Sequence, residues 1–546
     1  MRKRFTGLAI VVLAILAWSV VYPNVSVVVG SFARGLADWR AFFHSPADHE
    51  ALVNTIVIAV ASVVASLAIG VPLAFLLTRF EFRGRRLMSA FAVLPAALPP
   101  LVGVIAFLFL YGESGVVTRA VQHLLGLRRA PWSLNGVWAI VFVHAYTMYV
   151  YVFLFVSAGL ERYDTSLDEA AEGLGASRAM RLRRVTLPLL TPAIIGSMLL
   201  VFMSALGSFS APYIFGGGTR VLSTQILVSK LNGSMGLAYV ETSMLALTAV
   251  VALLVMRWVE RRREYSVSGK GRTTRTVVRS AFWRRAAPVL AGAAVIFLIL
   301  PHAMVVLVAF ARDGTWTTQV LPPQYTLDNF RRLATDPDLW RPIRNSVSMA
   351  GIATAANVIF GVAAAYLLVL TRAPGRKLLG LLVNLPWAIP ATAIALGLAA
   401  TFDRNSIVSA RVLLVGTFWI LPLAYFIRNI PIVTNAIEGS LRQMDGTVED
   451  AARGLGASWW LTMRRVVLPA ARPGLVAGAM LASVTAVGEF VASIVLFTHN
   501  NRPISIEILS QLRGLSFGTA AAYSVLLIVL VLIITTGARW AETRMA

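Results

Sequence analysis

Long hydrophobic stretches alternate with shorter polar segments along the whole chain. A transmembrane helix needs roughly 20 mostly apolar residues. Twelve stretches meet that requirement, at about 8–29, 51–78, 88–111, 136–158, 189–213, 238–258, 287–310, 345–370, 378–401, 412–434, 472–497 and 518–538. The pattern predicts an all-α membrane protein with about twelve transmembrane helices.

Composition supports a membrane protein. Of 546 residues, 58% are hydrophobic and 14% are charged, whereas soluble domains are about half apolar and about a quarter charged. The absence of cysteine excludes a disulfide scaffold, a thiolate zinc site, an iron–sulfur cluster and a cysteine nucleophile. The first stretch follows three basic residues, 2–4, as in a signal peptide. Its apolar run is longer than a signal core and no clear cleavage site follows, so we expect an uncleaved helix.

The net charge of +24 is concentrated in alternate loops. With the N-terminus inside, most Lys and Arg residues fall in cytoplasmic segments, including 79–86, 160–188 and 257–285. The positive-inside rule therefore predicts both termini in the cytoplasm. Topology and contact with anionic membrane lipid explain these clusters better than nucleic acid does.

The two halves of the chain resemble each other. The matching pairs are Asn54-Thr55 with Asn345-Ser346, Leu94-Pro95 with Leu385-Pro386, 169-EAAEGLGAS-177 with 450-DAARGLGAS-458, and Leu187-Pro188 with Leu468-Pro469. Each half holds six predicted helices, so both enter the membrane in the same direction, as two parallel repeats. We expect a first half at 1–258, a cytoplasmic linker at 259–285 and a second half at 286–546.

The loop between the fourth and fifth helices carries the repeated motif, at 160–188 and at 438–469. An acidic residue near a helix N-terminus suits the helix dipole, and a following Ala-Ala pair forms helix without bulk. Glycine permits a left-handed backbone, so Gly175 and Gly456 can end such a helix. Pro188 and Pro469 suit the first turn of the next helix. A simple hairpin between two helices is the alternative, but the second copy of the motif argues against it.

This duplicated motif resembles the EAA motif of binding-protein-dependent ABC importer permeases. The resemblance implies the type I ABC importer permease fold and loops that dock on a separate ATPase. It assigns that docking to Glu169, Ala170, Ala171, Gly175, Asp450, Ala451, Ala452 and Gly456, where Asp450 replaces the usual Glu.

Further expectations follow from the resemblance. They are two copies of an ABC ATPase, an extracytoplasmic solute-binding protein and a place in the bacterial cytoplasmic (inner) membrane. One polypeptide supplies both halves, as in the ferric-iron group and in related thiamine, phosphonate and sugar-phosphate systems. The segments 209-FSAPYIFGGG-218 and 488-GEFVASIVLFTHNNRPIS-505 resemble ferric-type permeases, so ferric iron is the first expectation for the substrate.

Catalytic and metal sites are not expected in this chain. A P-loop needs G-x4-G-K-[ST], and the one Gly-Lys pair, Gly269-Lys270, is followed by Gly271. ATP and magnesium are therefore expected on the partner ATPase, with no cofactor here. His44 and His49 lie near two acids and could touch a metal, but a solvated loop is the favoured interpretation.

Candidate pathway residues are polar groups inside predicted helices, where ionisable side chains are costly. Glu489 follows Gly488, and its repeat equivalent is Ser208, with Ser210 nearby. An acid there could contact a cationic substrate or bond to neighbouring helices. Arg428 is expected near the cytoplasmic boundary, either paired or with its charged end extended to the interface, and His144 is expected to be a satisfied interhelical group.

The remaining polar candidates are Ser204, Ser483 and Thr485, which could line a path or stabilise helix packing, as could Gly474-x3-Gly478. An ion-coupled secondary transporter is the alternative from another class. It would need buried ion-binding carboxylates, for which Glu489 is the one good candidate.

Overall fold

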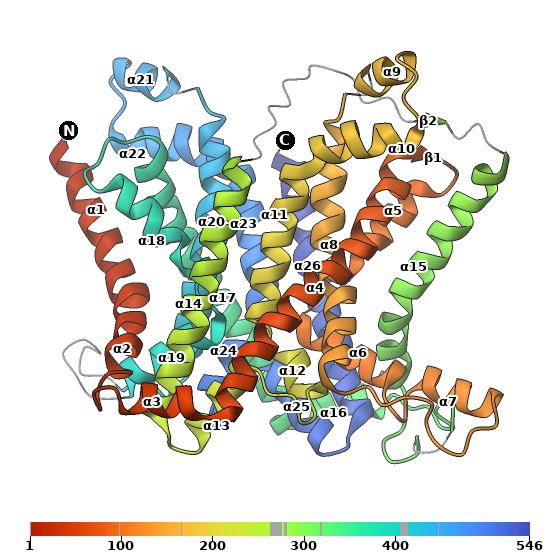
Figure 1. Ribbon diagram of the computed structural model, residues 1–546. Coiled ribbons are helices and arrows are strands. Elements are labelled where there is room, and N and C mark those ends of the chain that lie inside the picture. The colour runs from red at the N-terminus through yellow and green to blue at the C-terminus, as the bar shows by residue number, and fades with distance from the viewer. Residues whose placement is uncertain are drawn as a thin grey trace.

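The computed structural model describes residues 2–97, 99–164, 166–262, 276–277, 281–316, 319–403, 413–445 and 447–545. Eleven helices in this part of the chain are long and apolar enough to cross a membrane, and a bent helix pair makes a twelfth. The prediction of an all-α membrane protein is confirmed (Figure 1).

Most residues of the first half lie in helices, and these helices differ widely in length. They are α1 (Arg2–Leu16), the π-helical turn η1 (Ala17–Val21), α2 (Tyr22–Gly30), α3 (Ala37–His44), α4 (Pro46–Arg79), α5 (Arg85–Val93), the 3-10 turn η2 (Leu94–Ala97), α6 (Pro100–Tyr111), α7 (Val116–Leu124), α8 (Gly136–Glu161), α9 (Ser166–Gly173), α10 (Arg178–Arg181), the π-helical turn η3 (Leu182–Thr186), α11 (Leu187–Leu206), α12 (Ser210–Phe215), α13 (Leu222–Leu231) and α14 (Met235–Arg262).

The second half repeats this order. It contains α15 (Ala281–Ala309), α16 (Asp328–Thr335), α17 (Pro337–Val369), α18 (Arg376–Ala388), α19 (Ala391–Phe402), α20 (Ile420–Arg442), α21 (Thr447–Gly454), α22 (Trp459–Thr462), the π-helical turn η4 (Met463–Val467), α23 (Leu468–Val487), α24 (Val491–Leu496), α25 (Ile504–Arg513) and α26 (Phe517–Met545). A two-residue parallel pairing joins β1 (Phe80–Glu81) to β2 (Thr276–Val277). Most of the predicted linker 259–285 lies outside the described residues.

The two longest helices, α4 and α17, start with the same local chemistry. The Ser45 side chain accepts a hydrogen bond from the Asp48 amide, and Pro46 occupies the first turn. Asp336 accepts from the Asp338 amide before Pro337 in the same way. A capping oxygen and a proline suit this position because the first-turn amides lack helical partners.

Two predicted spans, 88–111 and 378–401, are not single helices. In the second half, α18 and α19 meet at an angle of 106°, at Pro390, whose ψ of 147° is extended. In the first half, α5 and α6 are separated by η2 and by Pro99, with a ψ of 137°. Proline lacks an amide hydrogen and restricts the residue before it, which breaks the helix at both repeat positions.

The first helix of each half packs against the other half. The Phe5 ring of α1 lies 5.6 Å from that of Tyr366 in α17, between centroids. In return, α15 packs against the first half, where the Tyr146 hydroxyl donates to the Leu298 carbonyl at 2.6 Å. The halves predicted from the sequence are therefore interleaved in space.

The short helices are arranged differently at the two ends of the molecule. In Figure 1 the short helices α9 and α21 stand apart from each other at the end where α1 begins and α26 finishes. At the opposite end, α12, α13 and α25 gather near the centre. We call the first the coupling-loop end, after the docking role that the resemblance implies for the loops 160–188 and 438–469, and the second the seal end, after the aromatic contact described below.

Candidate functional site

The loop 160–188 forms the short helix α9, which ends as the sequence predicted. Gly175 has a φ of +82°, and the Ala176 amide donates to the Ala171 carbonyl at 3.0 Å. This closing bond satisfies a carbonyl that would otherwise be left without a partner at the helix end. Glu169 and Ala170 are exposed, and Ala171 is half-buried.

The second loop, 438–469, has the same geometry. Gly456 also has a φ of +82°, and the Ala457 amide donates to the Ala452 carbonyl at 3.1 Å. Asp450 lies in α21 and Ala451 is exposed. Two loops distant in sequence therefore present the same capped helix.

The most exposed large hydrophobic residue of each loop was not singled out from the sequence. Leu174 is 89% exposed and Leu455, its repeat equivalent, is 90% exposed. A single exposed leucine needs no explanation, but two at the tips of equivalent capped helices form a matched pair. The signal was present in the repeated GLGAS sequence, where only the glycine was singled out.

The acid that ties α9 to the helix bundle is Asp168, one residue before the predicted Glu169. Asp168 forms an ion pair with Arg79 at the end of α4 and accepts from the Tyr163 hydroxyl at 2.8 Å. Burial raises the pKa of the Tyr163 phenol, so the hydroxyl keeps its proton and remains a donor. This anchor couples α9 to the longest helix of the first half.

A different contact anchors α21. Glu449, the repeat equivalent of Asp168, is buried and accepts from the Tyr366 hydroxyl at 3.3 Å. Trp459 donates to the same hydroxyl at 3.1 Å. Asp168 therefore bonds to α4 and Glu449 bonds to α17. The partner on the long helix is an arginine in the first half and a tyrosine in the second.

Between the halves, two repeat-equivalent phenylalanines meet face to edge. The rings of Phe209 and Phe490 are 5.9 Å apart between centroids, and both side chains are buried. Each stands directly before a short helix, α12 or α24. We call this aromatic pair and its neighbours the central seal.

The central seal is also closed by contacts with the helix breaks. A Cβ atom added to Gly488 would lie 2.6 Å from Pro99 Cβ, and one added to Gly207 would lie 3.7 Å from Pro390 Cβ. Further contacts join the halves beside it: Lys230 donates to the Val495 carbonyl, and the Arg513 guanidinium lies 5.4 Å from the Tyr213 ring centroid.

The Glu489 carboxylate has two partners within the second half. Its Oε1 accepts from the Ala492 amide at 3.0 Å, and its Oε2 lies 3.1 Å from Arg428 Nε. Arg428 is the ninth residue of α20, nearer the seal end of that helix, so its predicted place at the cytoplasmic boundary is wrong. Pairing with an acid makes a position inside the membrane tolerable.

In the first half, neutral groups occupy the equivalent place. The Ser208 hydroxyl lies 2.8 Å from His144 Nε2, and His144 Nδ1 lies 2.9 Å from the Ser62 hydroxyl. His144 is therefore an interhelical hydrogen-bonding group, as predicted. Ser210 begins α12 and is buried.

Two further polar candidates form hydrogen bonds with neighbouring helices. Ser483 lies 3.1 Å from the Thr354 hydroxyl, and Thr485 donates to Asn429 at 2.6 Å. A Cβ atom on Gly474 would lie 2.2 Å from the Ala436 carbonyl oxygen, so α20 and α23 approach closely only because this residue is glycine.

Within the described residues, no group of three or more His, Asp or Glu side chains is placed to hold a metal ion. His44 Nδ1 lies 2.8 Å from the Arg40 carbonyl of its own helix.

Comparisons with known proteins agree with the repeated architecture. The family described as "Binding-protein-dependent transport system inner membrane component" matches residues 66–265 and 357–546, well over half of the chain.

Three relatives align along most of their length. A probable ABC transporter permease protein, y4fN, of Sinorhizobium fredii is 29% identical over 462 residues, covering 84% of this chain and 81% of the relative. The ferric transport system permease protein FbpB of Actinobacillus pleuropneumoniae is 27% identical, covering 87% of this chain and 69% of its own. The Fe(3+)-transport system permease protein FbpB 2 of Haemophilus influenzae is 22% identical, with 93% and 92% covered.

Proposed function

Because the chain belongs to the family of binding-protein-dependent transport system inner membrane components and is an ABC importer permease with both halves fused, we propose that it imports ferric iron. The relatives whose printed names specify a ferric system align along most of this chain, which supports that substrate. A solute-binding protein delivers the iron, and thiamine, phosphonate and sugar phosphate are the competing substrates.

The coupling role belongs to the two capped loops. In this proposal Glu169, Ala170, Ala171 and Gly175 dock on one ATPase copy, and Asp450, Ala451, Ala452 and Gly456 dock on a second. The supporting observation is the equal geometry of the loops, each ending at a glycine with a φ of +82° and each exposing a leucine. ATP and magnesium bind to the ATPase copies, and this chain performs no bond chemistry.

The transport cycle follows from the two ends of the molecule. The coupling helices α9 and α21 stand apart (Figure 1), while the rings of Phe209 and Phe490 are in contact in the central seal. This arrangement is suited to an inward-facing state. ATP binding brings the two ATPase copies together, and α9 and α21 move with them. The anchors at Asp168 and Glu449 pass that motion to α4 and α17, and the halves part at Phe209 and Phe490. The coupling-loop end, with both termini, faces the cytoplasm.

Copurification of the tagged chain from its native membrane tests the proposal. Quantitative mass spectrometry should find two ATPase chains per permease, together with a binding protein whose ligand is ferric iron. A ratio of one would contradict docking at both loops. A binding protein loaded with thiamine or a phosphonate would replace iron as the substrate and leave the coupling proposal in place.

A further inference from the structure

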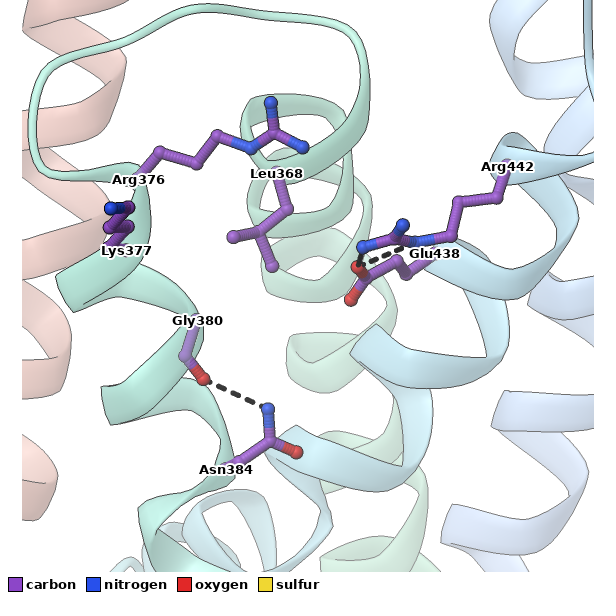
Figure 2. A pocket seen from close by; sticks show the side chains of 7 residues that line it. All are labelled: Leu368, Arg376, Lys377, Gly380, Asn384, Glu438 and Arg442. Atoms are coloured by element: carbon purple, nitrogen blue, oxygen red, sulfur yellow. Dashed lines mark hydrogen bonds and ion pairs between the residues drawn. The ribbon is translucent and has the colours of Figure 1, made fainter. Parts of the chain in front are cut away.

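An open pocket of about 430 Å³ lies between α18 and α20 at the coupling-loop end of the second half. Arg376 and Lys377, in the first turn of α18, line one side, and Glu438 and Arg442, in the last turns of α20, line the other (Figure 2). Asn384, about two turns further along α18, forms part of the wall.

The charges in this pocket do not cancel. Arg442 donates to Glu438 Oε1 from Nε at 3.0 Å and from a terminal nitrogen at 2.6 Å, so these two groups neutralise each other. Neither Arg376 nor Lys377 has an ion-pair partner among the described residues, and Figure 2 draws no bond to either. The pocket therefore carries two uncompensated positive charges.

The first half lacks this arrangement although it has the same fold. Arg85, the repeat equivalent of Arg376, is buried; it donates to the Leu77 carbonyl at 2.7 Å and lies 3.5 Å from Glu81. Arg372 occupies the position equivalent to Glu81. Thus an acid that forms an ion pair with the arginine in one half is replaced by another base in the other half.

We infer that the pocket between α18 and α20 binds a phosphate-class anion, either a lipid headgroup or a soluble phosphate compound. Guanidinium groups match the geometry of phosphate oxygens, and an ammonium group adds a compact charge. The pocket volume accommodates a phosphate monoester or a phosphodiester headgroup. The bound anion bridges the start of α18 and the end of α20, and four residues separate that end from α21.

Lysine labelling provides a direct test, because the chain has only four lysines, Lys3, Lys230, Lys270 and Lys377. The purified chain in zwitterionic phosphatidylcholine nanodiscs is treated with limiting acetylating reagent, and the acetylation of Lys377 is measured relative to Lys270. Inorganic phosphate and diphosphate are titrated at constant ionic strength. A second set of nanodiscs contains phosphatidylglycerol and no added phosphate.

Protection of Lys377 by soluble phosphate or diphosphate would support a soluble ligand. Protection only in nanodiscs with phosphatidylglycerol would support a lipid headgroup. Equal acetylation of Lys377 under all conditions, or parallel protection of Lys270, would overturn the inference.

Variants that remove either a positive or a negative charge from the pocket distinguish a specific site from an effect of general surface charge. Arg376→Gln should raise the half-protecting anion concentration about fivefold, since each basic group near an anionic surface contributes on the order of 1 kcal/mol. Glu438→Gln should lower it, because the pocket gains a positive charge. Arg86→Gln, an exposed first-half control at the position equivalent to Lys377, should leave it unchanged. The same response from all three variants would contradict a site at this pocket.

Discussion

Arg428 Nε and Glu489 Oε2 are 3.1 Å apart inside the second half, where the first half has Thr147 and Ser208 at the equivalent positions. One repeat therefore carries an ion pair beside the central seal and the other carries neutral hydroxyls. Glu489 holds two donors in place, since its other oxygen caps α24 through the Ala492 amide. Both carboxylate oxygens of Glu489 are therefore bonded to groups of the protein. In this state the carboxylate is poorly suited to bind a cationic substrate.

The first prediction concerns this ion pair. Arg428→Gln should destabilise the protein by about 2 kcal/mol, because it leaves a largely buried carboxylate without its partner; the partial exposure of Arg428 keeps the loss below that of a fully buried pair. Arg428→Thr combined with Glu489→Ser, which copies the first half, should recover much of that loss. Thermal unfolding of the purified chain measures both, and a double variant less stable than the single one would contradict the account.

The second prediction concerns the contact between Gly488 and Pro99. Gly488→Ala places a methyl group 2.6 Å from the proline, so the central seal must shift at a cost of about 1–3 kcal/mol. Uptake should fall about tenfold. Gly207→Ala is the matched control, because its added Cβ atom lies 3.7 Å from Pro390, an ordinary contact. Similar uptake by the two variants would show that the proline contacts do not control the seal.

The third prediction concerns the ends of the coupling helices. Gly175→Val combined with Gly456→Val should abolish uptake and leave membrane insertion intact, because valine is strained at a φ of +82°. Gly173→Ala with Gly454→Ala is the control, since both residues lie in helices with open space around them. Uptake assays and membrane fractionation measure the two effects, and normal transport by the valine variant would refute the coupling role.

The fourth prediction concerns the exposed leucines. Leu174→Asp with Leu455→Asp should weaken retention of the ATPase by at least about tenfold, since each leucine loses an apolar contact worth roughly 1.5–3 kcal/mol when buried. Folding should be unaffected, because both side chains are already almost fully exposed. Leu124→Asp, an exposed leucine at the seal end, provides the control. Unchanged copurification of the ATPase would exclude these leucines from the interface.

Local requirements explain what the sequence alone determined. A helix in a bilayer must satisfy its backbone internally and be apolar along its length, so hydropathy locates the spans without knowledge of their neighbours. A left-handed helix end requires glycine for reasons confined to one residue, so Gly175 and Gly456 identify both coupling helices. The repeat then supplied the parallel order of the halves, and their resemblance to importer permeases supplied the function.

Contacts between distant segments were decided only by the tertiary structure. From the sequence, Arg428 was expected at the cytoplasmic boundary, either paired or extended to the interface, because a charge in a hydrophobic stretch does not identify a partner 61 residues away. The resemblance assigned ATPase docking to Glu169, but nothing in the sequence indicated that the adjacent Asp168 anchors α9, because that role depends on the position of Arg79 in the fold. The exchange of α1 and α15 between the halves also lay beyond the sequence, because hydrophobic faces favour burial without specifying the partner that covers them.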